Sequence, residues 1–189
     1  MTGIIILDGP DACGKTTLQE YVANTYGAVK IHLTYPAPDN YKDMFEYQLL
    51  ELIKAIEMSK SNLVVIDRHW ISEMIYAKVF RGGSPWPHMP YVMDALCRFN
   101  GALYILCLPG SIEGALQRHR ENIDSAHPYN DEKFRELLIE YNDFYINTGA
   151  NRLDMLKYTI ERNGDDMGKF ATDAMRQLIS IRKLVEAWK

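Results

Sequence analysis

The segment best suited to chemistry is residues 9–16, Gly-Pro-Asp-Ala-Cys-Gly-Lys-Thr, which matches the full pattern G-x-x-x-x-G-K-[ST] between an apolar run and a helical segment. Glycines there let backbone N–H groups wrap a phosphate chain, and the start of the following helix adds partial positive charge. In such a loop Lys15 would reach the β- and γ-phosphates, and the Thr16 hydroxyl would bind Mg²⁺. We therefore expect ATP and Mg²⁺ as cofactors. The expected binding residues are Gly9, Asp11, Ala12, Cys13, Gly14, Lys15, Thr16 and Thr17.

A second pair of interest is Asp67 and Arg68, which follow the apolar run at residues 63–66. A carboxylate that leaves a strand beside the phosphate loop can hold the water shell of Mg²⁺, and the adjacent arginine can face an anionic substrate. The alternative is that Asp67 caps the next helix and Arg68 forms a surface ion pair. Because the phosphate loop is complete, we favour the functional role, with Thr16 and Asp67 as metal ligands. His69 is expected to be packed rather than catalytic.

Two further arginines, Arg118 and Arg120, precede a polar stretch between two predicted helices. Phosphoryl transfer needs positive charge on the γ-phosphate oxygens and exclusion of water, and a mobile lid that carries arginines supplies both. We predict such a lid over about residues 118–130. Side chains two positions apart on a helix point in different directions, so a solvated helix face is the alternative for either arginine. The predicted catalytic residues are Lys15, Asp67, Arg68, Arg118 and Arg120.

Short apolar runs alternate along the chain with longer segments of helical periodicity. Nearly continuous β-branched runs such as residues 3–8 are typical of central parallel strands that are covered on both faces. This order predicts a three-layer α/β fold of the P-loop type, with a five-stranded parallel sheet, flanking helices and a small helical lid in one domain, residues 1–189. Binding groups should collect at the carboxyl ends of the strands. The predicted strands are residues 3–8, 29–34, 63–67, 102–108 and 157–161, and the main helices are 15–26, 41–59, 72–80, 131–147 and 167–188.

Composition narrows the class of ligand. The 189 residues carry a net charge of −4, which offers no basic field for a nucleic acid polymer and favours a small anionic ligand. The three cysteines, Cys13, Cys97 and Cys107, have the spacing of neither a disulfide framework nor a zinc site. No apolar stretch approaches the roughly 18 residues of a membrane span, so we expect a cytoplasmic protein. The expected partners are a small-molecule nucleotide acceptor, no nucleic acid polymer and no membrane, with a homodimer left open.

These segments together resemble the thymidylate kinase family of nucleoside monophosphate kinases and its deoxynucleoside kinase relatives. The resemblance covers most of the chain and rests on LDGPDACGKTT at residues 7–17, DRHWISEMIYA at 67–77, LYILCLPGSIEGALQRHREN at 103–122 and DEKFRELLIEYNDFY at 131–145. It implies an ATP- and Mg²⁺-dependent transfer to a monophosphate, with Arg68 on the acceptor phosphate and Asp11 near the sugar 3′-hydroxyl. It also implies that Ser72 and Tyr76 line the nucleoside pocket.

The base of the acceptor would need flat apolar walls. Phe45, on the helix after the second strand, is a candidate for stacking on the base, although an aromatic residue at helical spacing is more often part of the core. Tyr35 and Trp70 would add further walls. The segment Leu106-Cys107-Leu108-Pro109 lacks an acidic residue that the family usually carries before its proline turn. By analogy with the family, the acceptor is expected to be dTMP or a 5-modified dUMP.

Two kinds of acceptor differ in one physical requirement. A nucleoside 5′-hydroxyl must lose its proton, whereas a monophosphate oxygen is already ionised at neutral pH. The second strand is followed by Thr-Tyr-Pro-Ala-Pro, without an acid before Asp39, so the sequence favours the monophosphate. A deoxynucleoside kinase, a P-loop protein that binds nucleotide without turnover, and a P-loop NTPase that acts on nucleic acid remain the alternatives.

Overall fold

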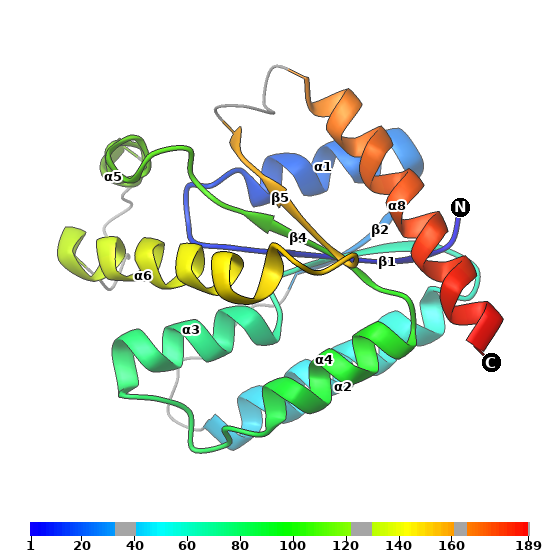
Figure 1. The fold of residues 1–189 in the computed structure, drawn as a ribbon, viewed down its shortest axis with the longest axis horizontal. Helices are drawn as coiled ribbons and strands as arrows, with labels where there is room; N and C mark the ends of the chain where they lie inside the picture. The colour runs from blue at the N-terminus through cyan, green and yellow to red at the C-terminus, as the bar shows by residue number, and fades with distance from the viewer. Residues whose placement is uncertain (33–40, 122–129, 161–165, 189) are drawn as a thin grey trace.

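The computed structural model describes residues 1–32, 41–121, 130–160 and 166–188, which form a three-layer α/β fold around a five-stranded parallel sheet (Figure 1). The strands lie in the order β2-β3-β1-β4-β5, and every pair is parallel. This arrangement confirms the fold class predicted from the sequence. The strands are β1 (Gly3–Asp8), β2 (Val29–His32), β3 (Leu63–Asp67), β4 (Leu103–Cys107) and β5 (Met155–Tyr158).

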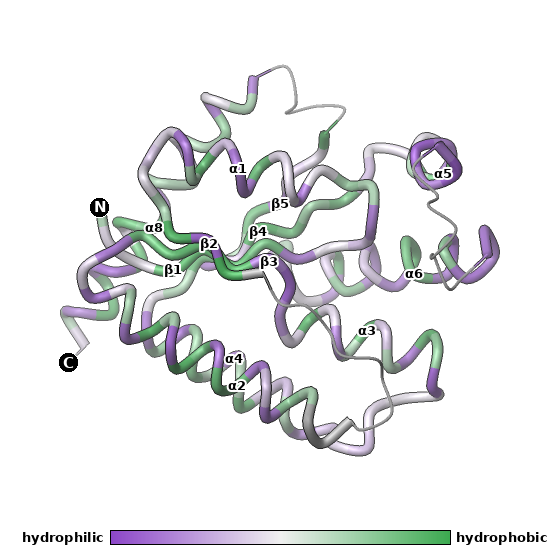
Figure 2. The backbone as a smooth tube through the Cα atoms, turned by 180° about the vertical axis from the view of Figure 1, so that it is seen from behind, coloured by the Kyte–Doolittle hydropathy of each residue, from purple (hydrophilic) through white to green (hydrophobic). Residues whose placement is uncertain are grey.

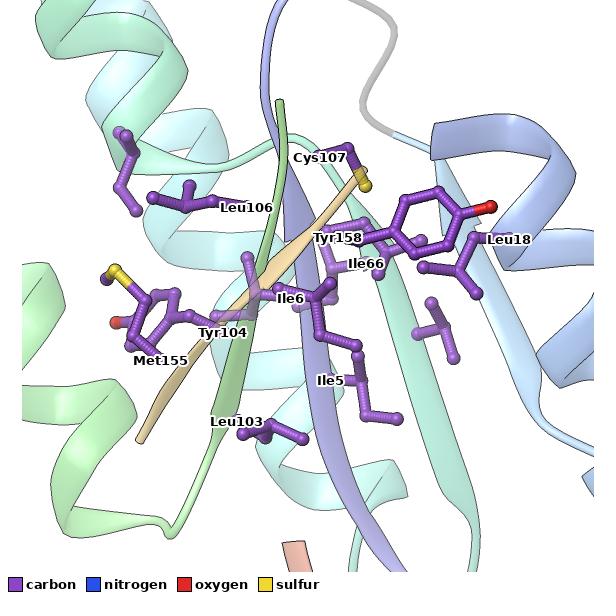
Figure 3. Close-up of a cluster of buried hydrophobic side chains, with 14 of the residues drawn as sticks. Ile5, Ile6, Leu18, Ile66, Leu103, Tyr104, Leu106, Cys107, Met155 and Tyr158 are labelled. Atoms are coloured by element: carbon purple, nitrogen blue, oxygen red, sulfur yellow. The ribbon is translucent and has the colours of Figure 1, made fainter. Parts of the chain in front are cut away.

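The three central strands are buried along their whole length. Ile6 of β1 lies in register with Ile66 of β3 on one side and Tyr104 of β4 on the other. The side chains of Ile5, Ile6 and Ile66 point into a continuous apolar cluster (Figure 3). Continuous apolar runs form such strands because both faces of a parallel sheet are covered by helices. The carboxyl ends of β1, β3 and β4 therefore meet at one edge.

Helices cover both faces of the sheet (Figures 1 and 2). One face carries α1 (Lys15–Tyr26) and α8 (Met167–Trp188), and the other carries α2 (Tyr41–Met58), α3 (Trp70–Arg81), α4 (Met89–Phe99) and α6 (Asp131–Phe144). The short α5 (Ile112–Glu121) lies beyond the carboxyl ends of the strands. In the part of the chain that the structure describes, no helix combines the length and the apolar character that a membrane crossing requires.

Several boundaries differ from the sequence prediction. β5 begins two residues earlier than expected, because Met155 is in register with Tyr104 of β4. The predicted helix over residues 131–147 ends at Phe144 and continues as a π-helical turn, η1 (Tyr145–Gly149). There Gly149 packs so closely that an added Cβ would lie 2.5 Å from Sδ of Met155. The last two residues of the predicted strand 29–34, and most of the predicted lid, fall outside the described residues.

His69 is fully buried, as the sequence analysis expected for a packed histidine. Burial penalises its charged form and lowers the pKa of the imidazole to about 4, while the backbone of Gln48 acts in the opposite sense. In the unfolded chain the imidazole of His69 has its ordinary pKa of 6.5. Between pH 4 and pH 6.5 the unfolded chain therefore binds more protons at His69 than the folded protein does. The neutral His69 therefore contributes stability that is complete above pH 6.5 and is lost as the pH falls toward 4.

We expect the free energy of unfolding of the wild type, relative to that of His69→Gln, to fall by about 2 kcal/mol between pH 7 and pH 5. Burial raises the pKa of Glu73 to about 7, and this shift makes the free energy of unfolding change with pH in the opposite direction. Because Glu73 is present in both proteins, the comparison with the variant removes its contribution. Urea titrations at the two pH values measure the difference. An unchanged difference would show that His69 does not titrate in this way.

Candidate active site

The phosphate loop connects β1 to α1 and turns sharply at two glycines. Gly9 has φ 142°, and a Cβ there would lie 2.2 Å from the carbonyl oxygen of Cys107, so only glycine fits against the end of β4. Gly14 has φ 81° and is the N-cap of α1. Because glycine has no side chain to cap the helix, the first-turn N–H groups of α1 face the loop without a side-chain cap. Such an uncapped helix start is suited to an anion.

Two cationic side chains reach this loop from different helices. Lys15 is 6% exposed, and its Nζ donates to the carbonyl oxygen of Pro10 at 2.6 Å. Arg118 of α5 donates from Nε to the carbonyl oxygen of Ala12 at 3.1 Å. Thr16 and Thr17 are exposed in the first turn of α1. A lysine, an arginine and two threonines therefore lie together at the loop, among them the Lys15, Thr16 and Thr17 that the sequence named as donor-site candidates.

The pKa of the Cys107 thiol is affected by several charged groups near the carboxyl ends of the strands. Burial is the main cause that raises its pKa, the charge of Lys15 lowers it, and Asp67 and Asp8 raise it further. Asp67 is 2% exposed and is in register with Leu7, next to the loop. The charges of Lys15, Asp67 and Asp8 thus all lie close enough to the Cys107 thiol to affect its pKa.

Asp8 is the functional residue that sequence reasoning missed. It is fully buried, and its Oδ1 accepts hydrogen bonds from the N–H of Gly9 at 2.8 Å, the hydroxyl of Ser72 at 2.5 Å and the hydroxyl of Tyr141 at 3.1 Å. Its Oδ2 accepts from the backbone N–H groups of His69 at 3.0 Å and Ser72 at 3.2 Å. Burial raises the pKa of Asp8, whereas the Ser72 side chain, the charge of Arg68 and the backbone N–H groups of Gly9 and His69 oppose the shift. The one signal in the sequence was that Asp8 is an acidic residue at the carboxyl end of an apolar strand.

These bonds make Asp8 the N-terminal cap of α3. The N-cap residue of α3, His69, forms no side-chain cap itself. The first N–H groups of a helix need acceptors, and a carboxylate there is also favoured by the helix dipole. The carboxylate of Asp8, which comes from the neighbouring strand β1, supplies both the acceptor oxygens and the negative charge.

Arg68 lies between β3 and α3 and faces the phosphate loop. Its φ of 70° is in the left-handed region, and its N–H donates to the carbonyl oxygen of Leu7 at 2.8 Å. The guanidinium forms an ion pair with Asp11 and donates to the hydroxyl of Tyr76 at 3.3 Å. Tyr76 donates in turn to Asp11 at 3.3 Å. The structure therefore joins Asp11, Arg68 and Tyr76 in one cluster beside the loop.

The two predicted lid arginines have different surroundings. Arg118 points to the loop, as described above, whereas Arg120 binds Oδ2 of Asp131 through Nε at 2.7 Å and through a terminal nitrogen at 2.5 Å. The Arg120 side chain is 59% exposed. The structure thus selects Arg118 as the arginine of the candidate site, a choice that the sequence left open.

Three of the predicted pocket walls lie in the interior. Phe45 is 2% exposed and Trp70 is 4% exposed. The indole N–H of Trp70 donates to the hydroxyl of Tyr104 at 3.0 Å, and its ring packs edge-on against Phe144. The Ser72 hydroxyl is engaged with Asp8. Tyr35 lies outside the described residues. Of the predicted acceptor-side residues, the structure therefore brings Arg68 and Tyr76 to Asp11 of the loop and buries Phe45, Trp70 and Ser72.

A pocket of about 530 Å³ lies between α3, α4 and α6, and its lining includes Met74, Lys78, Tyr91, Glu140 and Phe144. Helical spacing puts Met74 and Lys78 on the face of α3 opposite to Tyr76 and Phe80. The charged cluster that contains Tyr76 is therefore on the other side of α3 from this pocket. The charged cluster is therefore the candidate nucleotide site, because phosphates need the cations that gather there.

No protein-family model matches the chain, and no curated protein sequence matches it. Solved structures with a similar fold include the YorR protein from Bacillus subtilis in complex with phosphorylated GDP, which is 20% identical, with a TM-score of 0.71 over 95% of this chain and 97% of that one. Deoxyadenosine kinase from M. mycoides with bound dCTP is 16% identical, with a TM-score of 0.58 over 92% of this chain and 98% of that one. A gluconokinase from Sinorhizobium meliloti 1021 is 15% identical, with a TM-score of 0.53 over 100% of this chain and 98% of that one. At these identities the likeness concerns the fold, which this chain shares with kinases.

The different surroundings of the two arginines lead to a paired test. We expect Arg118→Ala to lower kcat for phosphoryl transfer by about 100-fold or more, because it removes positive charge beside the phosphates. Arg120→Ala should change kcat by less than about threefold, since an exposed ion pair contributes little. Steady-state kinetics of both variants with ATP decide the matter. A larger loss in Arg120→Ala would reverse the assignment.

Proposed function

We propose that this protein transfers the γ-phosphoryl group of ATP to a deoxynucleoside monophosphate, such as dTMP or a 5-modified dUMP, and so forms the diphosphate. The observation that carries the proposal is the position of Arg68, which is held beside the phosphate loop in contact with Asp11. It would provide a further cationic group, beside the loop and separate from Lys15 and Arg118, for the phosphate of the acceptor. The fold shared with a deoxyadenosine kinase and a gluconokinase supports a phosphotransferase.

On the donor side, the loop amides and the start of α1 would hold the β-phosphate. Lys15 and Arg118 now donate to loop carbonyls and would exchange these for phosphate oxygens when ATP binds. Their charge would then stabilise the γ-phosphoryl group as it transfers. A protein that only binds nucleotide has no need of such groups, so their presence supports turnover.

The metal expected at such a site is Mg²⁺. Among the described residues there is no group of three or more His, Cys, Asp or Glu side chains that could hold a metal ion. Mg²⁺ usually takes only one or two protein oxygens, together with substrate phosphates and water. The exposed hydroxyl of Thr16 and the carboxylate of Asp67 supply oxygens of this kind. When bound, Mg²⁺ would neutralise charge on the phosphate oxygens.

On the acceptor side, a phosphate dianion would compete with Asp11 for the guanidinium of Arg68. Arginine binds phosphate in a two-pronged geometry, and the bond is strengthened by both charges. Asp11, released from this pair, could accept a hydrogen bond from the sugar 3′-hydroxyl. Tyr76 is in contact with both residues and would border the sugar. The identity of the base rests on the resemblance to thymidylate kinases.

One observation favours a second candidate, a deoxynucleoside kinase. The Asp11 carboxylate is 26% exposed and is paired with Arg68, the residue proposed to face the acceptor, so it could take the proton of a nucleoside 5′-hydroxyl bound there. From the sequence, a carboxylate base for a nucleoside was expected only after the second strand, whereas Asp11 precedes it. A nucleoside, however, carries no negative charge for Arg68 to bind, and we therefore favour the monophosphate.

A panel of acceptors distinguishes the two candidates. Each of the deoxynucleoside monophosphates, the ribonucleoside monophosphates and the nucleosides is incubated with ATP and Mg²⁺, and release of ADP is followed. We expect turnover with pyrimidine deoxynucleoside monophosphates and little with nucleosides. Turnover of nucleosides alone would favour the second candidate, and a preference for dAMP or dGMP would keep the kinase but change the base.

The role of Arg68 has its own test. We expect Arg68→Ala to raise KM for the acceptor by about 10- to 100-fold, because a hydrogen bond to a charged group contributes about 1.5–3 kcal/mol. KM for ATP should change by less than about threefold. Arg176→Ala, which removes an exposed arginine from α8, is the control. Equal increases in both KM values would contradict an acceptor role for Arg68.

A further inference from the structure

The direction of the Arg68 side chain depends on an unusual backbone conformation. A non-glycine residue in the left-handed region is strained, and such strain persists only where the surroundings hold it in place. The N–H of Arg68 is bound to Leu7, and the next residue, His69, is bound to Asp8. The turn that carries Arg68 is thus held from β1 at two consecutive positions.

Asp8 is itself held by two hydroxyl groups. The Ser72 hydroxyl donates to Oδ1 of Asp8, the Tyr141 hydroxyl also donates to it, and the two hydroxyl oxygens are 2.8 Å apart. All three side chains are buried. A carboxylate in such surroundings keeps its charge and its orientation only while its donors stay in place.

Tyr141 brings a third element into this network, because it belongs to α6. This helix packs against α3, which begins just after Arg68, and against α5, which carries Arg118. The contact between α5 and α6 includes the stacked rings of His119 and Phe134, whose centroids are 4.0 Å apart. α6 is therefore placed between the helices that support the two arginines of the candidate site.

We propose that Tyr141 is a positioning residue for phosphoryl transfer: its hydroxyl, through Ser72 and Asp8, holds the turn before α3 and so directs Arg68 toward the acceptor. The inference rests on the acceptor role proposed for Arg68. It adds a residue that touches neither ATP nor acceptor and that comes from the helix following the predicted lid.

The direct test is Tyr141→Phe, which removes one hydroxyl and keeps the ring. We expect kcat/KM for the acceptor to fall by about 10- to 100-fold, since a small misplacement of a positioning group has effects of this size. KM for ATP should change by less than about threefold. A loss spread equally over both substrates, or no loss, would overturn the proposal.

Tyr104→Phe is the matched control. Tyr104 is also fully buried, and its hydroxyl also binds an α3 residue, Trp70, but it has no part in the Asp8 network. Both variants should lower the melting temperature, whereas only Tyr141→Phe should lower kcat/KM for the acceptor. Equal kinetic losses in the two variants would assign the effect to general stability and contradict the proposal.

A double variant tests the route through Ser72. If Tyr141 and Ser72 act as one unit, Ser72→Ala combined with Tyr141→Phe should lose little more activity than the more damaging single variant. Losses that multiply would show that Tyr141 acts by another route and would overturn this part of the proposal.

A structural measurement separates this inference from the proposed function. Crystal structures of the wild type and Tyr141→Phe report φ of Arg68 and its ion pair with Asp11, whichever acceptor the protein uses. We expect Arg68 to leave the left-handed region or to lose Asp11 in the variant, and to keep both in Tyr104→Phe. An unchanged Arg68 in Tyr141→Phe would overturn the positioning role, whereas a wild type that phosphorylates no monophosphate would contradict only the proposed function.

Discussion

The buried carboxylate of Asp8 is the interaction on which the candidate site depends. It binds the first N–H of the phosphate loop, the first turn of α3 and the hydroxyl of Tyr141 on α6. A buried carboxylate is tolerated only when hydrogen-bond donors replace the water around it. Here the donors come from three separate segments: the phosphate loop, α3 and α6. The same bonds that stabilise the carboxylate therefore fix the positions of these segments relative to one another.

Each cation around the phosphate loop is paired with a group of the protein. Lys15 and Arg118 are bound to loop carbonyls, and Arg68 is bound to Asp11. Each cation thus has a partner before any phosphate arrives, which lowers the cost of holding positive charges close together. In the proposed function, phosphate oxygens would take the places of these acceptors, so that binding would exchange one set of charged hydrogen bonds for another.

Parts of the site could be read from the chain, because their signals are local. The glycines of the loop, Lys15 and Thr16 lie within eight consecutive residues, and their chemistry requires that spacing. Asp67 and Arg68 follow a strand whose apolar run is continuous. The role expected of Ser72 rested on the resemblance, and Trp70 was expected as a flat apolar wall for the base. In the structure both side chains turn inward, because α3 presents them to Tyr104 and to Asp8.

The sequence by itself determined the α/β class, the position of the phosphate loop and the strands whose ends surround it, since apolar periodicity and glycine spacing act over a few residues. Only the tertiary structure decided between Arg118 and Arg120, joined Arg68 to Asp11, and made Asp8 the cap of α3. These contacts connect residues between 11 and 106 positions apart. Hydrogen bonds and ion pairs of that kind depend on how helices pack on the sheet, and no local pattern in the chain encodes that packing.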